Sequence, residues 1–195
     1  MRSLIAASLP VRPAGPLSAT LMTDLRTDHA GETGAVMIYR GILAVTRDAG
    51  VRRFAREHLA TETEHLAAIE PLLPLRQRSR LLLLWRSAGW LTGALPAMLG
   101  PRAVYATIEA VETFVDQHYS AQIESIDRLD PGCTHPPLQA LRMLLQSCRA
   151  DEIRHRDEAA LLLAGSDKPA SLALRLWVGL VGAGSRVAVT VCRRI

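Results

Sequence analysis

The pattern Glu-x-x-His occurs twice in this chain, as ETEH from Glu62 to His65 and as EIRH from Glu152 to His155. Residues three positions apart lie on the same face of an α-helix, so each stretch offers a carboxylate and an imidazole from one helix turn. Ten glutamates and six histidines in 195 residues would give about 0.3 such pairs by chance. The two pairs therefore predict helices that carry matched metal ligands.

Both pairs lie in long segments in which apolar residues recur every three or four positions. Strand-like alternation is essentially absent, and the segments are separated by breaks such as Asp48–Gly50 and Asp130–Gly132. The sequence therefore predicts an all-α protein with four long helices. Their expected ranges are 22–48, 51–74, 101–128 and 137–164.

Each of these four helices has one glutamate on an otherwise largely apolar face, which is the face that a bundle helix turns toward its core. The four inward residues are Glu32, Glu62, Glu112 and Glu152. Removing a carboxylate from water costs several kcal/mol, and these faces carry no lysine or arginine to compensate. Bound cations are therefore expected.

Two divalent ions would balance the four carboxylates, and His65 and His155 would add one nitrogen ligand to each ion. A glutamate from each of two helices plus Glu-x-x-His from each of the other two is the ligand set of ferritin-like di-iron and di-manganese proteins. Oxygen and nitrogen ligands without thiolates suit iron or manganese. We therefore predict a ferritin-like four-helix bundle.

Two alternatives to this ligand set stay open. In the first, the four glutamate-bearing faces point to solvent, because the inward face of each helix has been assigned to the wrong residues. In the second, Glu109, which lies one turn before Glu112, takes the inward position in its place. The register favours Glu112. His58 also falls on the inward face, where a core histidine, or one that supports the ligands, is favoured over a seventh ligand.

Asp151 is expected to support the centre without binding metal. It lies four residues before His155, so that it can accept a hydrogen bond from the imidazole nitrogen that does not bind metal. A surface salt bridge with Arg154 or Arg156 is equally compatible with its position.

Length and composition set the broader limits. A chain of 195 residues suits one domain, expected over 22–195, and residues 1–21 read as a disordered leader, with a transit peptide as the less favoured alternative. Three cysteines without a C-x-x-C pair argue against a disulfide framework and against structural zinc. The net charge of +4 suits an anionic membrane surface as well as nucleic acid.

Two shorter apolar segments, at about 80–99 and 169–192, predict accessory helices at a membrane interface. Leu81 to Leu99 is apolar apart from Arg86, contains two tryptophans and follows a basic stretch, a composition typical of an interfacial segment. Burial of both segments against the bundle is the alternative. Glycines, Pro96 and Arg86 argue against a transmembrane helix in the first segment.

Several motifs, in the same order, resemble those of the demethoxyubiquinone hydroxylases. The matching stretches are DHAGE at 28–32 with Gly34-Ala35, the helix with Glu62 and His65, AVE at 110–112, His118-Tyr119, the stretch from Glu152 to Asp157, and GSRVA at 184–188. The similarity covers roughly residue 22 to the end. Thr33 departs from it, since many members carry an aromatic residue there.

This resemblance implies a monooxygenase that uses dioxygen and two electrons to hydroxylate the ring of a polyprenyl-methoxy-benzoquinone in ubiquinone biosynthesis. It implies two iron ions, with NADH as the ultimate reductant, although no G-x-G-x-x-G motif for a bound nucleotide occurs. His118 and Tyr119 then become candidates for substrate positioning or proton transfer. No catalytic residue is predicted beyond these and the metal ligands.

The implied partners are the quinone, a membrane surface and other ubiquinone-biosynthesis proteins, with a homo-oligomer also compatible and no nucleic acid. The implied location is the cytoplasmic face of a bacterial inner membrane, or the matrix side of the mitochondrial inner membrane. Two other functions stay open. One is an iron oxidase or peroxidase related to ferritin or rubrerythrin, and the other is a metal-free helical adaptor or membrane-binding protein.

Overall fold

The computed structural model describes residues 17–132, 134–165 and 171–194. Within these ranges all regular structure is helical, which confirms the all-α prediction. Two short 3-10 turns, Glu70–Leu72 and Leu75–Gln77, precede the third α-helix. The α-helices are α1 (Ala19–Val45), α2 (Ala49–Ile69), α3 (Leu82–Leu99), α4 (Pro101–Leu129), α5 (Pro136–Ala164) and α6 (Leu172–Cys192).

Most helix boundaries differ from the predicted ones by one to five residues, and two of these differences have clear local reasons. Helix α1 begins at Ala19, inside the expected leader, because the Ser18 hydroxyl accepts a hydrogen bond from the Leu21 amide and caps the first turn. The expected leader otherwise falls on residues 1–16, which lie outside the described residues. Helix α2 ends at Ile69 rather than 74, where a 3-10 turn containing Pro71 follows it.

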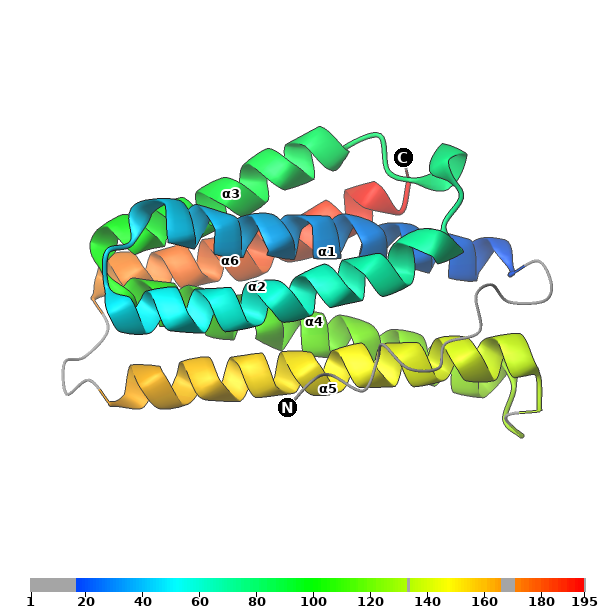
Figure 1. The fold of residues 1–195 in the computed structure, drawn as a ribbon. Helices are drawn as coiled ribbons and strands as arrows, with labels where there is room; N and C mark the ends of the chain where they lie inside the picture. Colours follow the sequence, from blue (N-terminus) through cyan, green and yellow to red (C-terminus); the bar gives the residue numbers. More distant parts are fainter. Residues whose placement is uncertain (1–16, 133, 166–170, 195) are drawn as a thin grey trace.

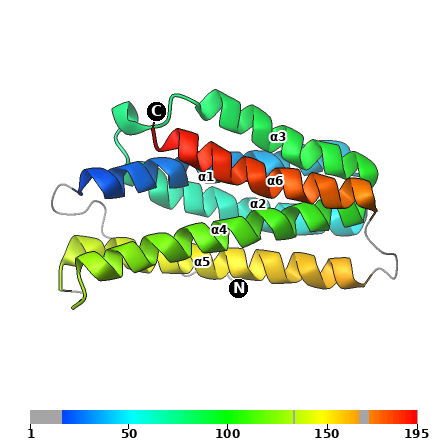
Figure 2. The same cartoon turned by 180° about the vertical axis from the view of Figure 1, so that it is seen from behind.

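Helices α1, α2, α4 and α5 form a four-helix bundle (Figure 1). Helix α1 packs on α2, α2 on α5, and α5 on α4. The accessory helices α3 and α6 lie on the side of the bundle away from α5 (Figure 2), with α3 against α1 and α4 and α6 against α4 and α1. Helix α6 has 21 residues and is as long as α2.

Glycines let α3 approach α1 until the two backbones touch. A Cβ atom added at Gly93 would lie 1.9 Å from the carbonyl oxygen of Ile38, and one added at Gly41 would lie 2.2 Å from that of Trp90. Side chains at these positions would therefore force the helices apart. The close approach fixes α3 as a cover over the bundle.

The apolar core forms two clusters with the glutamates between them. Along α1, Leu25 belongs to one cluster and Ile42 to the other, and Glu32 lies between these two residues. The same order holds on the other three bundle helices, where Glu62, Glu112 and Glu152 separate members of the two clusters. The bundle therefore holds one charged layer between two apolar ones.

The glycine contact predicts a difference between two substitutions on the same helix. Gly41→Ala should lower the free energy of unfolding by about 1–3 kcal/mol, because the new methyl group meets the backbone of α3. Gly31→Ala should leave it unchanged or raise it by up to about 1 kcal/mol, because the added Cβ would meet no atom of a neighbouring described element within 4 Å. Denaturant titration measures both, and equal stabilities would contradict the packing account.

Candidate metal centre

The structure brings all six residues that the sequence suggested as metal ligands into one buried cluster. They form two groups, and within each group one ligand-type atom per residue lies within 4.8 Å of the others. One group is Glu32, Glu62, His65 and Glu152, and the other is Glu62, Glu112, Glu152 and His155. Glu62 and Glu152 belong to both groups and therefore lie between two possible cation positions.

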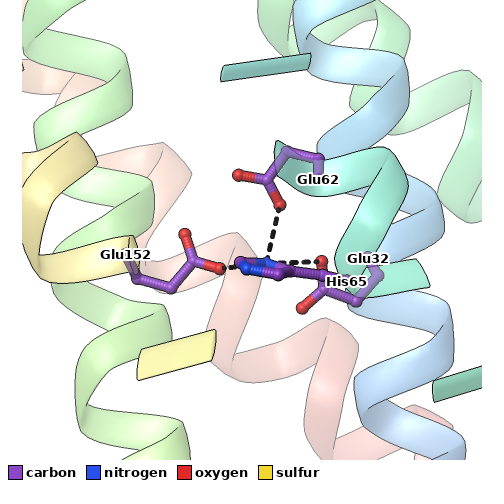
Figure 3. Close-up of side chains that lie close together, drawn as sticks. All are labelled: Glu32, Glu62, His65 and Glu152. Atoms are coloured by element: carbon purple, nitrogen blue, oxygen red, sulfur yellow. Dashed lines mark ion pairs between the residues drawn. The ribbon is translucent and has the colours of Figure 1, made fainter. Parts of the chain in front are cut away.

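The first group converges on the imidazole of His65 (Figure 3). Its Nδ1 atom lies 3.1 Å from Glu152 Oε1 and 3.7 Å from both Glu62 Oε2 and Glu32 Oε2. These residues come from α1, α2 and α5, so the arrangement depends on the packing of three helices. One imidazole nitrogen thus faces oxygens from three carboxylates.

The second group is arranged in a similar way around His155. Its Nδ1 atom lies 3.0 Å from Glu62 Oε1 and 3.4 Å from Glu152 Oε2. Glu112 of α4 completes this group. Each histidine thus directs Nδ1 toward the two shared carboxylates, and each group has one further glutamate of its own.

The inward atoms fit a divalent cation better than they fit one another. Despite the short distances, six inward atoms are buried and have no hydrogen-bond partner among the residues that the structure describes. They are His65 Nδ1, His155 Nδ1, Glu32 Oε2, Glu62 Oε1 and both carboxylate oxygens of Glu152. A buried polar atom without a partner costs about 1–3 kcal/mol, and more when it is charged. Nitrogen and oxygen donors of this kind, without a thiolate, can bind iron or manganese.

Asp151 orients one of the two imidazoles, but it is not the one that was expected. The carboxylate of Asp151 lies 3.0 Å from Nε2 of His65 on α2, so the prediction that it pairs with His155 was wrong. A proton on Nε2 leaves Nδ1 with its lone pair toward the carboxylates. Arg154 also donates a hydrogen bond to Asp151, so the salt bridge considered as an alternative is present as well.

Burial and mutual contact shift the proton affinities of the cluster in opposite directions. Burial raises the pKa of Glu32 to about 8 and that of Glu112 well above its usual value. Burial also acts to raise the pKa of Glu62, but contacts with His155 and His65 outweigh it and lower that pKa. Burial opposes protonation of His155, yet Glu152 and Glu62 raise its pKa to about 10.

Two tyrosines hold the glutamates that are not shared. The Tyr39 hydroxyl donates to Glu112 Oε1 at 3.0 Å, and the Tyr119 hydroxyl donates to Glu32 Oε1. Tyr119 is thus a buried aromatic residue that also contacts the cluster. Sequence reasoning gave Tyr39 no role, although it lies two turns after Glu32 on the same helix face.

The remaining candidates lie outside both groups. His118 Nε2 lies 3.1 Å from Asp28 Oδ1, in a polar cluster beside Glu32 rather than in contact with the six residues. Glu109 lines a surface cleft between α4 and α6, as the preferred register of α4 implies. His58 contacts Tyr39 and Glu158, and its ring lies against that of His155 at a tilt of 31°, with 3.9 Å between ring centroids.

A four-helix bundle with paired carboxylate and histidine groups defines a protein of the ferritin-like class with a candidate dimetal site. The chain belongs to the family of the ubiquinone biosynthesis protein COQ7, whose family model matches residues 19–192. This membership confirms the resemblance that the motifs indicated.

Named relatives of the chain are quinone hydroxylases. It is 38% identical to the 3-demethoxyubiquinol 3-hydroxylase of Rhodospirillum rubrum over 188 residues, which cover 94% of this chain and 82% of the relative. It is 33% identical over 175 residues to the human mitochondrial NADPH-dependent 3-demethoxyubiquinone 3-hydroxylase, covering 88% of this chain and 76% of the relative. A bacterial relative from Paracidovorax citrulli is 32% identical over 165 residues, covering 81% and 76%.

The pKa values predict that metal binding releases protons. At pH 7 the raised pKa values of His155, about 10, and Glu32, about 8, favour their protonated forms, whereas metal ligands must be deprotonated. Adding Fe²⁺ anaerobically in dilute buffer should therefore release about one proton or more per chain, and apparent affinity should rise from pH 6 to pH 8. A pH-indicator dye measures the release. Binding without release at pH 7 would contradict the assignment.

Proposed function

We propose that this protein is a di-iron monooxygenase that hydroxylates the ring of a polyprenyl-methoxy-benzoquinone in ubiquinone biosynthesis. The observation that carries the proposal is the pair of buried groups that share Glu62 and Glu152. Family membership and the activities for which the relatives are named supply the substrate class and the reaction. The overall change is ring C–H plus dioxygen, two electrons and two protons to ring C–OH plus water.

Each residue of the cluster has a role in this proposal. Glu32 with His65 and Glu112 with His155 would hold one iron each, and Glu62 and Glu152 would bridge the two ions. The irons would supply binding and reduction of dioxygen. Asp151 orients the His65 ring, and Tyr39 and Tyr119 keep the outer glutamates in place by hydrogen bonds.

The cluster also excludes bulk water. All six side chains are almost fully buried between the two apolar clusters of the bundle. A dry site strengthens the attraction between carboxylates and cations and protects reactive oxygen chemistry from side reactions. A reduced nicotinamide nucleotide would be the ultimate electron source. The human relative is named NADPH-dependent, whereas the motifs had suggested NADH.

The apolar accessory helices support a location on a membrane surface. Leu83 and Met98 of α3 are 78% and 71% exposed, and Leu176 and Leu180 of α6 are 66% and 64% exposed. Helix α6 is also long and apolar enough to cross a membrane, and only 11% of its most apolar stretch is buried in the protein. Because a polyprenyl quinone dissolves in the bilayer, exposed apolar helices would bring the bundle to its substrate.

We infer that α3 and α6 lie in the membrane interface rather than across the bilayer, because Arg175 and Arg186 interrupt α6. The inner membrane is the location that the resemblance implied, and the eukaryotic relatives are named as mitochondrial proteins. The side expected from the motifs is the cytoplasmic face in a bacterium or the matrix face in a mitochondrion.

The ligand assignment predicts opposite results for two glutamates on one helix. Glu112→Ala should lower the iron content below two per chain and reduce quinone hydroxylation at least about 100-fold, because a terminal ligand is lost. Glu109→Ala, one turn earlier and outside both groups, should keep the iron content and the rate. Iron analysis and mass spectrometry of the product measure both, with circular dichroism to confirm the helical fold.

Full hydroxylation by Glu112→Ala would contradict the assignment. Two irons per chain without any hydroxylated quinone, in the presence of a reductant, would favour an iron oxidase over a hydroxylase.

The membrane proposal predicts a difference between two exposed leucines. Leu176→Asp on α6 should lower binding to vesicles that contain anionic lipid about tenfold or more, because an apolar contact worth about 1.5–3 kcal/mol is lost and a charge is added. Leu161→Asp is the control, since this side chain is 74% exposed and belongs to α5, the bundle helix that lies away from α3 and α6. Co-flotation with vesicles measures binding. Equal binding of the two variants would exclude α6 as a membrane contact.

A further inference from the structure

We propose that Glu158, His58 and Tyr39 form a proton path from solvent to the metal centre, where the path ends at Glu112. Glu158 Oε2 lies 3.0 Å from His58 Nε2, and His58 Nδ1 lies 3.3 Å from the Tyr39 hydroxyl. That hydroxyl lies 3.0 Å from Glu112 Oε1. The path deepens the proposed function and rests on it, because it assigns a proton entry route to the same centre.

Only the first of these four residues is substantially exposed to solvent. The side chain of Glu158 is 47% exposed and that of His58 4% exposed, while Tyr39 and Glu112 are almost completely buried. Glu158 lies on α5 and His58 on α2, so the path enters the bundle where these two helices meet. It therefore connects water with the buried centre.

Packing holds the middle of the path in place. The His58 ring contacts two other rings. Its centroid lies 4.0 Å from that of Phe54 and 3.9 Å from that of His155. Tyr39 is packed in the same apolar cluster as Phe54. This packing restricts rotation of the His58 and Tyr39 rings, so that both nitrogens of His58 stay directed at Glu158 and Tyr39.

The four side chains can form two complete hydrogen-bonding patterns. In each pattern one of the two terminal carboxyl groups is ionised and the other three side chains are neutral. In the first, protonated Glu158 donates to His58 Nε2, His58 Nδ1–H donates to Tyr39, and Tyr39 donates to the Glu112 carboxylate. In the second, every donor is reversed and the proton lies at Glu112. To pass from the first pattern to the second, each of the three hydrogen bonds transfers its proton from donor to acceptor, so that one O–H or N–H bond breaks and another forms. The net result is the movement of one proton from Glu158 to Glu112.

His58 and Tyr39 have the same charge before and after this exchange. The path therefore carries protons without leaving a charge buried in its middle, where a charge would cost several kcal/mol. One further proton from water then resets the outer carboxyl group. Two such transfers supply the two protons that the conversion of dioxygen to water and a ring hydroxyl group consumes.

A second series of contacts also reaches the surface, but it cannot deliver protons in this way. His65 Nε2 contacts Asp151, which contacts the exposed Arg154. The other nitrogen of His65 faces the metal position, so a proton cannot pass through this ring while the nitrogen binds a metal ion. The Glu158 path reaches the centre through the Tyr39 hydroxyl group and ends on a carboxyl group with two oxygens, so a proton can arrive at Glu112 Oε1 while the other oxygen stays available to a metal ion.

The two sides of the bundle thus have different roles. The path opens between α2 and α5, whereas the apolar helices α3 and α6 lie on the side away from α5 (Figures 1 and 2). An enzyme that rests on a membrane by α3 and α6 would keep Glu158 in water. Protons and the apolar substrate would then arrive from opposite sides.

Proton uptake measured separately from product formation tests the path. The iron-loaded, reduced protein is mixed with oxygenated dilute buffer that contains a pH-indicator dye, and iron per chain is determined in parallel. Reduction of dioxygen itself consumes two protons per two electrons whether the product is hydrogen peroxide or water plus hydroxylated quinone. Water that binds to the ferric ions gives protons back, so the rate of the dye signal in each variant is compared with the wild-type rate under the same conditions. The dye therefore reports on the path with and without quinone.

Glu158→Gln keeps a hydrogen-bonding side chain beside His58 but removes the carboxyl proton. It should slow proton uptake at least about tenfold with iron content unchanged. Tyr39→Phe should slow it similarly, and the double variant should be no slower than the slower single variant, because both break the same path. Glu57→Gln, an exposed glutamate of α2 beside His58, should leave the rate unchanged.

Wild-type proton uptake in Glu158→Gln would overturn the path. Tyr39 contacts the proposed ligand Glu112, so Tyr39→Phe could also lose iron. In that case the Glu158→Gln result alone tests the path, because the hydrogen bond of Glu158 is to His58 and not to a proposed ligand. If the wild-type protein takes up protons but yields no hydroxylated quinone, the proposed substrate is wrong, and slowed uptake in Glu158→Gln still supports the path. Hydroxylation with unchanged uptake in Glu158→Gln rejects the path and leaves the proposed function intact.

Discussion

Four buried carboxylates at one level of the bundle are the constraint on which the rest of the structure depends. Glu32, Glu62, Glu112 and Glu152 come from four different helices, and within the described residues their ion pairs are with histidines rather than with lysine or arginine. Such a layer is tolerable only if cations and a few protons balance it. The two histidines, the two tyrosines and Asp151 then follow as the groups that complete, hold and orient this layer.

The four glutamates and two histidines could be predicted because helical periodicity determines which residues of one helix share a face. Contacts between helices could not be predicted in the same way. Asp151 was assigned to His155 because both lie on α5, yet it pairs with His65 of α2. That partner depends on how two helices are rotated against each other, and sequence spacing within one helix carries no information about it.

The same limit applies to Tyr39 and to the glycines. Tyr39 lies on the predicted inward face, but its hydrogen bond to Glu112 requires α1 and α4 to be placed side by side. Gly41 and Gly93 are unremarkable in sequence, and only the packed helices show that their backbones touch. The apolar character of α3 and α6 was visible in the sequence, whereas their position on one side of the bundle was not.

Equilibrium binding of ferrous iron to the anaerobic protein tests the central claim most directly. The account predicts two iron ions per chain, because two groups of four residues share Glu62 and Glu152 and leave their inward atoms without protein partners. Native mass spectrometry or iron analysis after gel filtration gives the count. A chain that binds no iron and still folds would contradict the claim, since the buried carboxylates would then be balanced in another way.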